Sequence, residues 1–577
     1  MDNLLKRLEQ RATLAPRSAS LRGATASGKL VALDARQLHD SVTALAQQLA
    51  QTGVRHIAIA GHNSPAWLVA QLAAWRAGLP VTPIPSFFSD DQVTHLLSTT
   101  GLDGILITDG SSLDRWVDAR LLPVFDRGLL PEQQPPHGIG VEPDVALFQR
   151  ASVPAPMPAE TRLITFTSGT TGTPKGVCLS GPHLESVLLG LDDRLQGIEL
   201  TRHGVVLPLA VLLEHLAGAL YALWRGAEVI IDPPQVTGLE GSGNLSCPHW
   251  QRWLAGRQPD SLILVPALLA ALCQIARQED DAPWMTSLNL VAVGGDHVPP
   301  VLLADAKALK LPVAQGYGMS EMGSVVCLSR PDEPQDGRVG RPLKGRDITT
   351  DPSGQLLVHG PRMLGYLGEA TDTGPGPMDV PWPSGDLGEQ HHGGHWHLSG
   401  RQRNVIILST GRNLSPEWIE AELATLAGID RAFVFGDGLP GLLALATLSS
   451  CQVDTTAIDS AIASLNQRLP DYARIRGWAP LTAALPGLPT PLSEASHELT
   501  SNGRLRRDGV RLRRHRDMQR LAEQSFCEAP PSEQTPCDPS LALPGDSADN
   551  VTNSLVEPLY RFSPQRVTRQ PGRPSDE

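Results

Sequence analysis

The stretch LITFTSGTTGTPKGVCLS, residues 163–180, decides how the rest of this chain is interpreted. An apolar run typical of a strand leads into a segment that combines small residues, hydroxyls and a single cation, Lys175. Glycine lets backbone N–H groups approach an anion closely, while hydroxyls and an ammonium add donors and positive charge. The pattern predicts a phosphate-binding loop, with a solvated Gly/Thr turn as the alternative. It is not a Walker loop, because Pro174 stands where that motif requires glycine.

Apolar runs on both sides of this stretch predict an α/β fold with largely parallel sheets. HIAIAG (56–61) is typical of a buried strand, and SPAWLVAQLAAWRAG (64–78) predicts a helix that opens at a Ser-Pro pair. We expect a large mixed α/β domain over residues 1–399 and a small α+β domain over 400–518. Residues 519–577 are rich in Pro, Ser, Asp and Gln, which predicts a disordered tail.

Composition excludes several classes of function. The net charge of −13 over 577 residues argues against a nucleic-acid partner, which requires a basic surface. Seven cysteines without a C-x-x-C pair suggest reduced thiols. We see no apolar run of about 18 residues, so no membrane span is expected. The first residues also lack a signal-peptide pattern, and the expected location is therefore the cytoplasm.

The string S-G-T-T-G-x-P-K-G resembles the phosphate-binding loop of the adenylate-forming superfamily, which includes acyl-CoA synthetases, nonribosomal peptide adenylation domains and beetle luciferases. Further segments resemble the family's motifs in the expected order. They are VAVGG (291–295), AQGYGMSEMG (314–323), SGDLGE (384–389) and LSGRQRNVIILSTGRNLSPEWIE (398–420). The resemblance covers about residues 20–515, and it implies a small domain that moves as a lid about Arg403.

The resemblance also implies a site for ATP. Tyr317 would stack on the base, Ser320 would touch the α-phosphate, and Asp386 and Arg401 would bind the ribose. The full set of implied nucleotide-binding residues is Thr167, Ser168, Gly169, Thr170, Thr171, Gly172, Gly295, Gln315, Gly316, Tyr317, Gly318, Ser320, Asp386 and Arg401. Magnesium (Mg²⁺) would be held by Thr170 and Glu321, because an acidic residue beside a triphosphate makes sense as a metal ligand. The implied catalytic residues are Lys175, Glu321 and Arg504.

Arg504 is where the chain departs from the family pattern. Relatives carry an adenylating lysine in the stretch that reads ELTSNGRLRRD (498–508) here, and no lysine follows Lys344. Arginine keeps the charge and can bridge two anionic oxygens, although its planar fork differs from an ammonium. We interpret Arg504 as a working replacement. The alternative is a non-catalytic, or half-reaction-impaired, acyl- or nucleotide-binding relative.

The expected function is ATP-dependent activation of a carboxylic acid to an acyl-adenylate, followed by transfer to a thiol. The thiol would belong to CoA or to the phosphopantetheine of an acyl carrier protein. LPLAVLLE (207–214) resembles a segment of the long-chain fatty acid type, so a medium or long fatty acid is the first expectation and an aryl acid the second. Val211 occupies the usual histidine position, and His215 lies just after Glu214, so acyl gating by a histidine is doubtful.

Two further runs have simpler explanations. HHGGHWH (391–397) is rich in histidine, but the family places an exposed β-turn there, and a turn accounts for it better than a metal site. The basic run RLRRDGVRLRRHR (504–516) could dock an acidic carrier protein or CoA phosphates, or it could be a solvated helix end.

Overall fold

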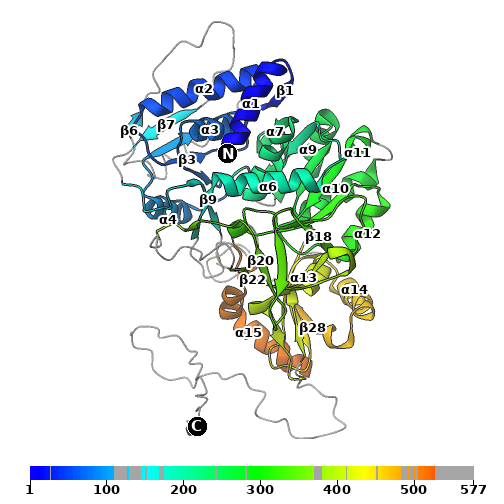
Figure 1. Ribbon diagram of the computed structural model, residues 1–577. Helices are drawn as coiled ribbons and strands as arrows, with labels where there is room; N and C mark the ends of the chain where they lie inside the picture. Colours follow the sequence, from blue (N-terminus) through cyan, green and yellow to red (C-terminus); the bar gives the residue numbers. More distant parts are fainter. Residues whose placement is uncertain are drawn as a thin grey trace, which may run out of the picture. The chain divides into compact units, whose positions relative to one another are not determined.

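The structure is a computed structural model that describes most of the chain up to Phe526 (Figure 1). The described residues are 1–25, 28–108, 126–128, 145–149, 153–167, 175–240, 244–279, 282–368, 380–410, 412–449, 453–481, 492, 496, 498–500 and 504–526. Met1–Phe526 forms one compact unit, and the predicted tail from residue 527 onward lies outside the described residues.

The larger sheet is parallel in its interior and antiparallel at both edges, so the predicted α/β architecture is confirmed. Its order is β19-β20-β22-β23-β18-β17-β16-β15-β14-β10-β11-β1-β2. Strands from β1 through β11, β10, β14 and β15 to β16 pair in parallel, whereas β16 to β19 pair antiparallel. The bounds are β1 Ala19–Ala24, β2 Leu30–Asp34, β10 Arg202–Val205, β11 Glu228–Ile231, β14 Ser261–Leu264, β15 Leu290–Val293, β16 Val313–Tyr317, β17 Cys327–Leu328, β18 Arg338–Pro342, β19 Asp347–Thr350, β20 Gln355–His359, β22 Trp382–Gln390 and β23 Trp396–Arg401.

A second sheet carries the phosphate-loop stretch in the order β21-β9-β8-β4-β3-β5-β7-β6. Strand β3 is buried along its whole length, as expected for a parallel strand covered on both faces. The bounds are β3 Ile57–Ala60, β4 Val81–Ile84, β5 Gly104–Ile107, β6 Asp126–Gly128, β7 Ala146–Gln149, β8 Thr161–Thr167, β9 Lys175–Ser180 and β21 Gly365–Tyr366.

One helix of this region begins where the sequence predicts it. The predicted helix at 64–78 is α3 (Pro65–Arg76), and the hydroxyl of Ser64 accepts a hydrogen bond from the Trp67 amide at its N-terminus. The other helices are α1 Asp2–Leu14, α2 Ala35–Gln51, α4 Asp90–Thr100, α6 Gly181–Arg194, the π-helix η1 Leu213–Leu220, α7 Tyr221–Arg225, α8 Pro234–Thr237, α9 Cys247–Arg257, α10 Pro266–Gln278, α11 Pro283–Ser287 and α12 Pro300–Ala308.

The C-terminal part has its own sheet, in the order β26-β27-β28, and its own hydrophobic clusters. Helix α15 packs against β27 and β28, and Figure 1 shows the orange helix beside β28. This helix includes residues 519–526, which the composition assigns to the tail, and Leu521 within it is buried. The bounds are α13 Pro416–Ala424, β26 Ile429–Phe435, β27 Leu442–Leu448, α14 Thr455–Arg468, β28 Ile475–Pro480 and α15 Arg507–Phe526.

Ion pairs hold α15 against the rest of the C-terminal part, so its basic residues are only partly exposed to solvent. The guanidinium of Arg514 donates to the Glu498 carboxylate at 2.5 Å, and both side chains are buried. Arg507 donates to Glu420 at 2.6 Å, again with both groups largely buried. Arg507 and Arg514 therefore support the packing of the C-terminal part, whereas Arg504 and Arg516 of the same run are exposed.

Candidate active site

The hairpin β8–β9 carries the predicted phosphate loop. Thr167 pairs with Lys175 across the two strands, so the hairpin closes at these two residues. The loop between them, with Ser168, Gly169, Thr170, Thr171 and Gly172, lies outside the described residues. The paired residues at the two ends of the loop nevertheless place the exposed Lys175 side chain at the end of the β8–β9 hairpin of the second sheet.

Tyr366 brings Lys175 and Glu321 together. The Lys175 Nζ lies 4.9 Å from the centroid of the Tyr366 ring, and the Tyr366 hydroxyl donates to Glu321 Oε1 at 3.1 Å. The strand β21 holds Tyr366 by pairing it with Val177 of β9. Glu321 lies on the short helix η2 (Ser320–Met322), and its carbonyl accepts from the Met363 amide at 2.7 Å. The sequence alone did not lead us to Tyr366. The pattern that could have indicated it is a single aromatic residue within GYLG (365–368).

Glu321 fits the expected role of a magnesium ligand. Its half-buried carboxylate accepts a hydrogen bond from the Tyr366 hydroxyl, and the described residues provide it with no ion-pair partner. A carboxylate oxygen without a cation beside it is the kind of donor that Mg²⁺ prefers. The other expected ligand, Thr170, lies outside the described residues.

Asp386 is held between Tyr317 and Arg401. The Tyr317 hydroxyl donates to Asp386 Oδ2 at 2.8 Å, and the Arg401 Nε lies 3.0 Å from Asp386 Oδ1. Asp386 and Arg401 face each other across β22 and β23, which explains their contact. Burial, and then the Asp386 carboxylate, raises the pKa of Tyr317 well above its usual range, so the phenol keeps its proton. Tyr317 as a whole residue is only 7% exposed, so little of its surface is open to an adenine base in this conformation.

The two segments expected to bind adenine lie side by side. Strands β15 and β16 pair in parallel, with Val293 opposite Gln315, so the turns that follow them share one end of the sheet. A Cβ on Gly318 would lie 1.5 Å from the Ser324 carbonyl oxygen, so only glycine fits there. The side-chain oxygen of Gln315 is buried and has no hydrogen-bond partner among the described residues. Gly316 and Ser320 lie near this edge and are partly buried.

Arg504 reaches the first of these turns. Its guanidinium donates a hydrogen bond to the carbonyl oxygen of Gly295, and its side chain is exposed. The backbone amide of Arg504 donates to the Thr500 hydroxyl at 3.0 Å, and the Thr500 amide donates to the Arg504 carbonyl at 2.7 Å. These two hydrogen bonds hold Arg504 to Thr500, and the contact with Gly295 places Arg504 beside the predicted nucleotide site.

The segment at 207–215 does not present a histidine for acyl gating. His215 packs between Trp67 and Trp75, with ring centroids at 5.2 and 6.0 Å, and it is 1% exposed. Burial lowers the pKa of His215 to about 3, so the ring is neutral. Glu214 accepts hydrogen bonds from the Val206 and Leu207 amides and lies 2.8 Å from His203 Nε2. Both residues are therefore structural parts of the π-helix η1.

Within the described residues, no helix has the length and apolar character needed to cross a bilayer.

Comparison with known proteins identifies the chain's relatives. Residues 9–367 match the family described as "AMP-binding enzyme". The indoleacetate–CoA ligase of Aromatoleum aromaticum is 27% identical over 436 residues, which are 69% of this chain and 79% of the relative. The feruloyl-CoA synthase of an Amycolatopsis species is 26% identical over 496 residues, which cover 80% and 92% of the two chains.

The fold is similar to that of solved ligases. The O-succinylbenzoate coenzyme A synthetase of Bacillus subtilis, solved with ATP and a magnesium ion, has a TM-score of 0.66 and 22% identity. The match covers 87% of this chain and 98% of that protein. Because the family match spans more than half of the residues, this chain belongs to the AMP-binding enzyme family and is an AMP-forming acid–thiol ligase.

Proposed function

We propose that the protein converts a carboxylic acid and ATP into an acyl-adenylate and pyrophosphate, and then transfers the acyl group to CoA. The observation that carries this proposal is the reach of Arg504 to Gly295, because it brings a cation of the small domain to the edge where the nucleotide is expected. An arginine there can contact both the carboxylate and the α-phosphate.

The first step joins two anions, so it requires positioning and neutralisation of charge. A carboxylate oxygen of the acid attacks the α-phosphorus, the bond to the bridging oxygen breaks, and pyrophosphate leaves with its electron pair. Lys175 would neutralise the phosphates from the hairpin tip, and Arg504 would hold the acid carboxylate against the α-phosphate. When bound, magnesium would neutralise phosphate oxygens, with Glu321 and Thr170 as its expected ligands.

The ribose would be bound by the Asp386–Arg401 pair. Asp386 can accept hydrogen bonds from the ribose hydroxyls while Tyr317 and Arg401 hold its carboxylate in place. Gly295, Gln315, Gly316, Gly318 and Ser320 would line the base and α-phosphate positions, with Thr167, Ser168, Gly169, Thr171 and Gly172 on the phosphates.

In the second step a thiol attacks the acyl carbonyl carbon, a thioester forms, and AMP leaves. We propose that residues 400–518 act as the mobile lid that separates the two steps, because this part has its own sheet and hydrophobic clusters. CoA is the favoured thiol, since the relatives described above are named for CoA products. A carrier-protein phosphopantetheine is the alternative, and the cytoplasm remains the predicted location.

For the acid, we propose a ring-bearing substrate such as an arylalkanoic acid. Indoleacetate and ferulate in the names of the two relatives support this class. The long-chain resemblance of 207–214 favours a medium or long fatty acid. However, Glu214 and the adjacent His215 are buried, so neither side chain supports a contact with such a substrate. The fatty acid therefore becomes the second candidate.

A pyrophosphate-release assay with a panel of aryl, arylalkanoic and fatty acids tests the proposal. We expect ATP-dependent release with a ring-bearing acid, and a thioester after CoA is added. Release with fatty acids alone would overturn the substrate class. Nucleotide binding without release from any acid would overturn the activity, and would favour a protein that binds nucleotide or acyl groups without the first half-reaction.

A further inference from the structure

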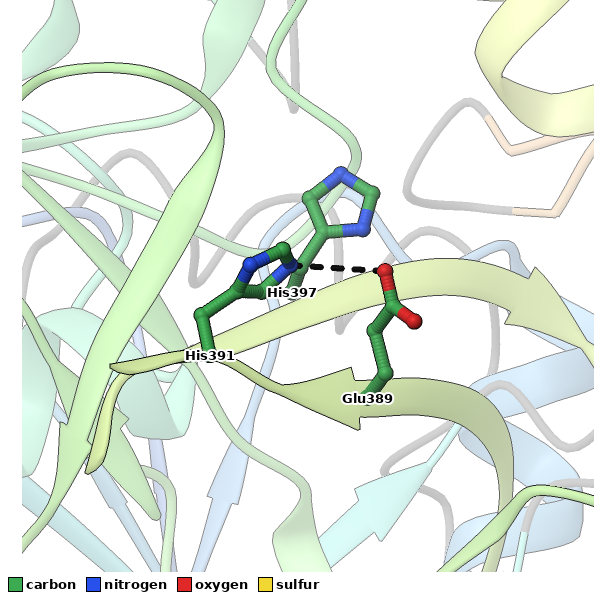
Figure 2. Close-up of side chains that lie close together, drawn as sticks. All are labelled: Glu389, His391 and His397. Carbon is green, nitrogen blue, oxygen red and sulfur yellow. Dashed lines mark ion pairs between the residues drawn. The ribbon is translucent and has the colours of Figure 1, made fainter. Parts of the chain in front are cut away.

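The hairpin of β22 and β23 carries three metal-ligating side chains near its turn: Glu389, His391 and His397 (Figure 2). Glu389 lies on β22 directly opposite His397 on β23, and His391 follows two positions after Glu389 in extended backbone. Residues opposite each other on antiparallel strands, and residues two positions apart on one strand, share a face. The strand register therefore explains why the three side chains converge.

Their geometry is close to that of a metal site. The possible ligand atoms all lie within 4.8 Å of one another, and Glu389 Oε1 is 3.4 Å from His391 Nε2. Two donors that each lie about 2.0–2.1 Å from one tetrahedral zinc ion are about 3.3–3.4 Å apart, so side-chain rotations must bring the more distant ligand atoms closer together. The side chains of Glu389 and His391 are 71% and 42% exposed and can make them. The backbone is fixed beneath them, because the His391 amide donates to the His395 carbonyl at 2.8 Å.

The four histidines of the 391–397 run are not equivalent. His395 is buried and directed elsewhere, with its Nε2 3.2 Å from Arg341 Nε and 3.7 Å from Glu333 Oε1. A tight turn explains Gly393 and Gly394, which both have φ of 79°, but it does not require a carboxylate opposite His397. Arg338 also neighbours His397, and its charge is compensated by Asp336.

We propose that Glu389, His391 and His397 bind one divalent transition-metal ion of the zinc class, with water completing the coordination. Imidazole ligands suit zinc, copper and nickel, whereas magnesium and calcium prefer oxygen ligands. The site is thus chemically distinct from the magnesium position expected at Glu321. An ion bound here would link β22 to β23, the same two strands that hold Asp386 and Arg401 in register.

The test is calorimetric titration of the tag-free full chain with ZnCl₂, and separately with MgCl₂. We expect saturable binding of one zinc ion per chain and none of magnesium at this site. His391→Gln and Glu389→Gln should each weaken zinc binding by at least about tenfold, since even outer-shell partners of metal ligands contribute about 10–100-fold. Both side chains are exposed, so both variants should fold, which circular dichroism verifies.

His392→Gln is the matched control, because His392 is exposed in the same turn but is not part of the cluster. It should leave the affinity for zinc unchanged. A zinc-dependent rise in melting temperature should also occur in the wild-type protein and in His392→Gln, but not in His391→Gln. Absence of saturable zinc binding would overturn the proposal, as would a loss in His392→Gln equal to that in His391→Gln.

Discussion

The guanidinium of Arg504 donates a hydrogen bond to the carbonyl oxygen of Gly295, although the two residues are 209 positions apart in the sequence. Glycine at this turn has a φ of +88°, which few other residues adopt, and a Cβ there would lie 3.7 Å from the arginine Nη2. The contact joins Arg504, which we propose takes the part of the family's lysine, to the turn expected to bind adenine.

Arg504→Ala should slow acyl-adenylate formation by about 10²–10³-fold, the usual effect of removing a preorganised donor to developing charge. Thioester formation from presynthesised acyl-adenylate should remain nearly unchanged, because the lid would present another face in that step. Arg504→Lys should stay active, since an ammonium keeps the charge. Separate assays of the two half-reactions check this, and equal losses in both for Arg504→Ala would indicate damaged folding instead.

Lys175→Ala and Glu321→Ala should each raise the barrier to adenylation by about 2–4 kcal/mol, because each removes a charge-stabilising group or its metal ligand. Pyrophosphate release measures this. Tyr366→Phe is the matched control: the ring under Lys175 stays, and only the hydrogen bond to Glu321 is lost, for an expected cost of about 0.5–1.5 kcal/mol. Unchanged release in both alanine variants would remove the basis for these two roles.

Asp386→Asn should raise the KM for ATP by about 10–100-fold, since hydrogen bonds to a charged group contribute about 1.5–3 kcal/mol. The kcat should change little, because the ribose is bound alike in the ground and transition states. Tyr317→Phe removes one donor to the same carboxylate and should give a smaller rise in KM. Steady-state kinetics with varied ATP decides this; a fall in kcat at constant KM would contradict the ribose assignment.

Buried neutral histidines should make the protein less stable in acid. Burial lowers the pKa of His215 and His183 to about 3, and that of His56 to about 4, from an ordinary value of 6.5. As the pH falls below 6.5, the unfolded chain binds protons that the folded protein does not, so the free energy of unfolding decreases toward pH 3. Denaturant unfolding at several pH values measures the slope.

His215→Phe should reduce that slope, because it removes one of these histidines while keeping a ring between Trp67 and Trp75. His392→Gln, at an exposed position, should leave the slope unchanged. A slope that is the same in His215→Phe and in the wild-type protein would show that His215 does not contribute.

Glu498→Gln should lower the free energy of unfolding of the C-terminal part by about 3–5 kcal/mol, because it removes the buried carboxylate charge that pairs with Arg514. Glu498 also accepts from the Leu492 amide at 3.0 Å, so the change weakens a second contact. Arg511→Ala breaks an exposed pair with Asp437 and should cost less than about 1 kcal/mol. Similar midpoints of chemical unfolding for the two variants would contradict this difference.

The sequence by itself determined the family of the protein and the local secondary structure around the site. Runs such as 56–61 became the buried strand β3 because a strand covered on both faces needs apolar residues throughout. Ser64 and Pro65 began α3 because the hydroxyl accepts from the Trp67 amide and proline needs no partner at the first turn. The phosphate-loop string predicted a strand that leads into a loop, and β8 does end at Thr167; the second strand, which begins at Lys175 and pairs with it, comes from the structure. These features depend on residues close together in the chain.

Only the tertiary structure decided which side chains from distant segments meet. The bridge of Tyr366 between Lys175 and Glu321 depends on β21 pairing with β9. Arg507 and Arg514 of α15 pair with Glu420 and Glu498 instead of facing solvent, and this depends on how the helix packs. The convergence of Glu389, His391 and His397 depends on a strand register that places residues opposite each other. Local patterns set the period and ends of each element, whereas such contacts arise from register and packing, which no single segment encodes.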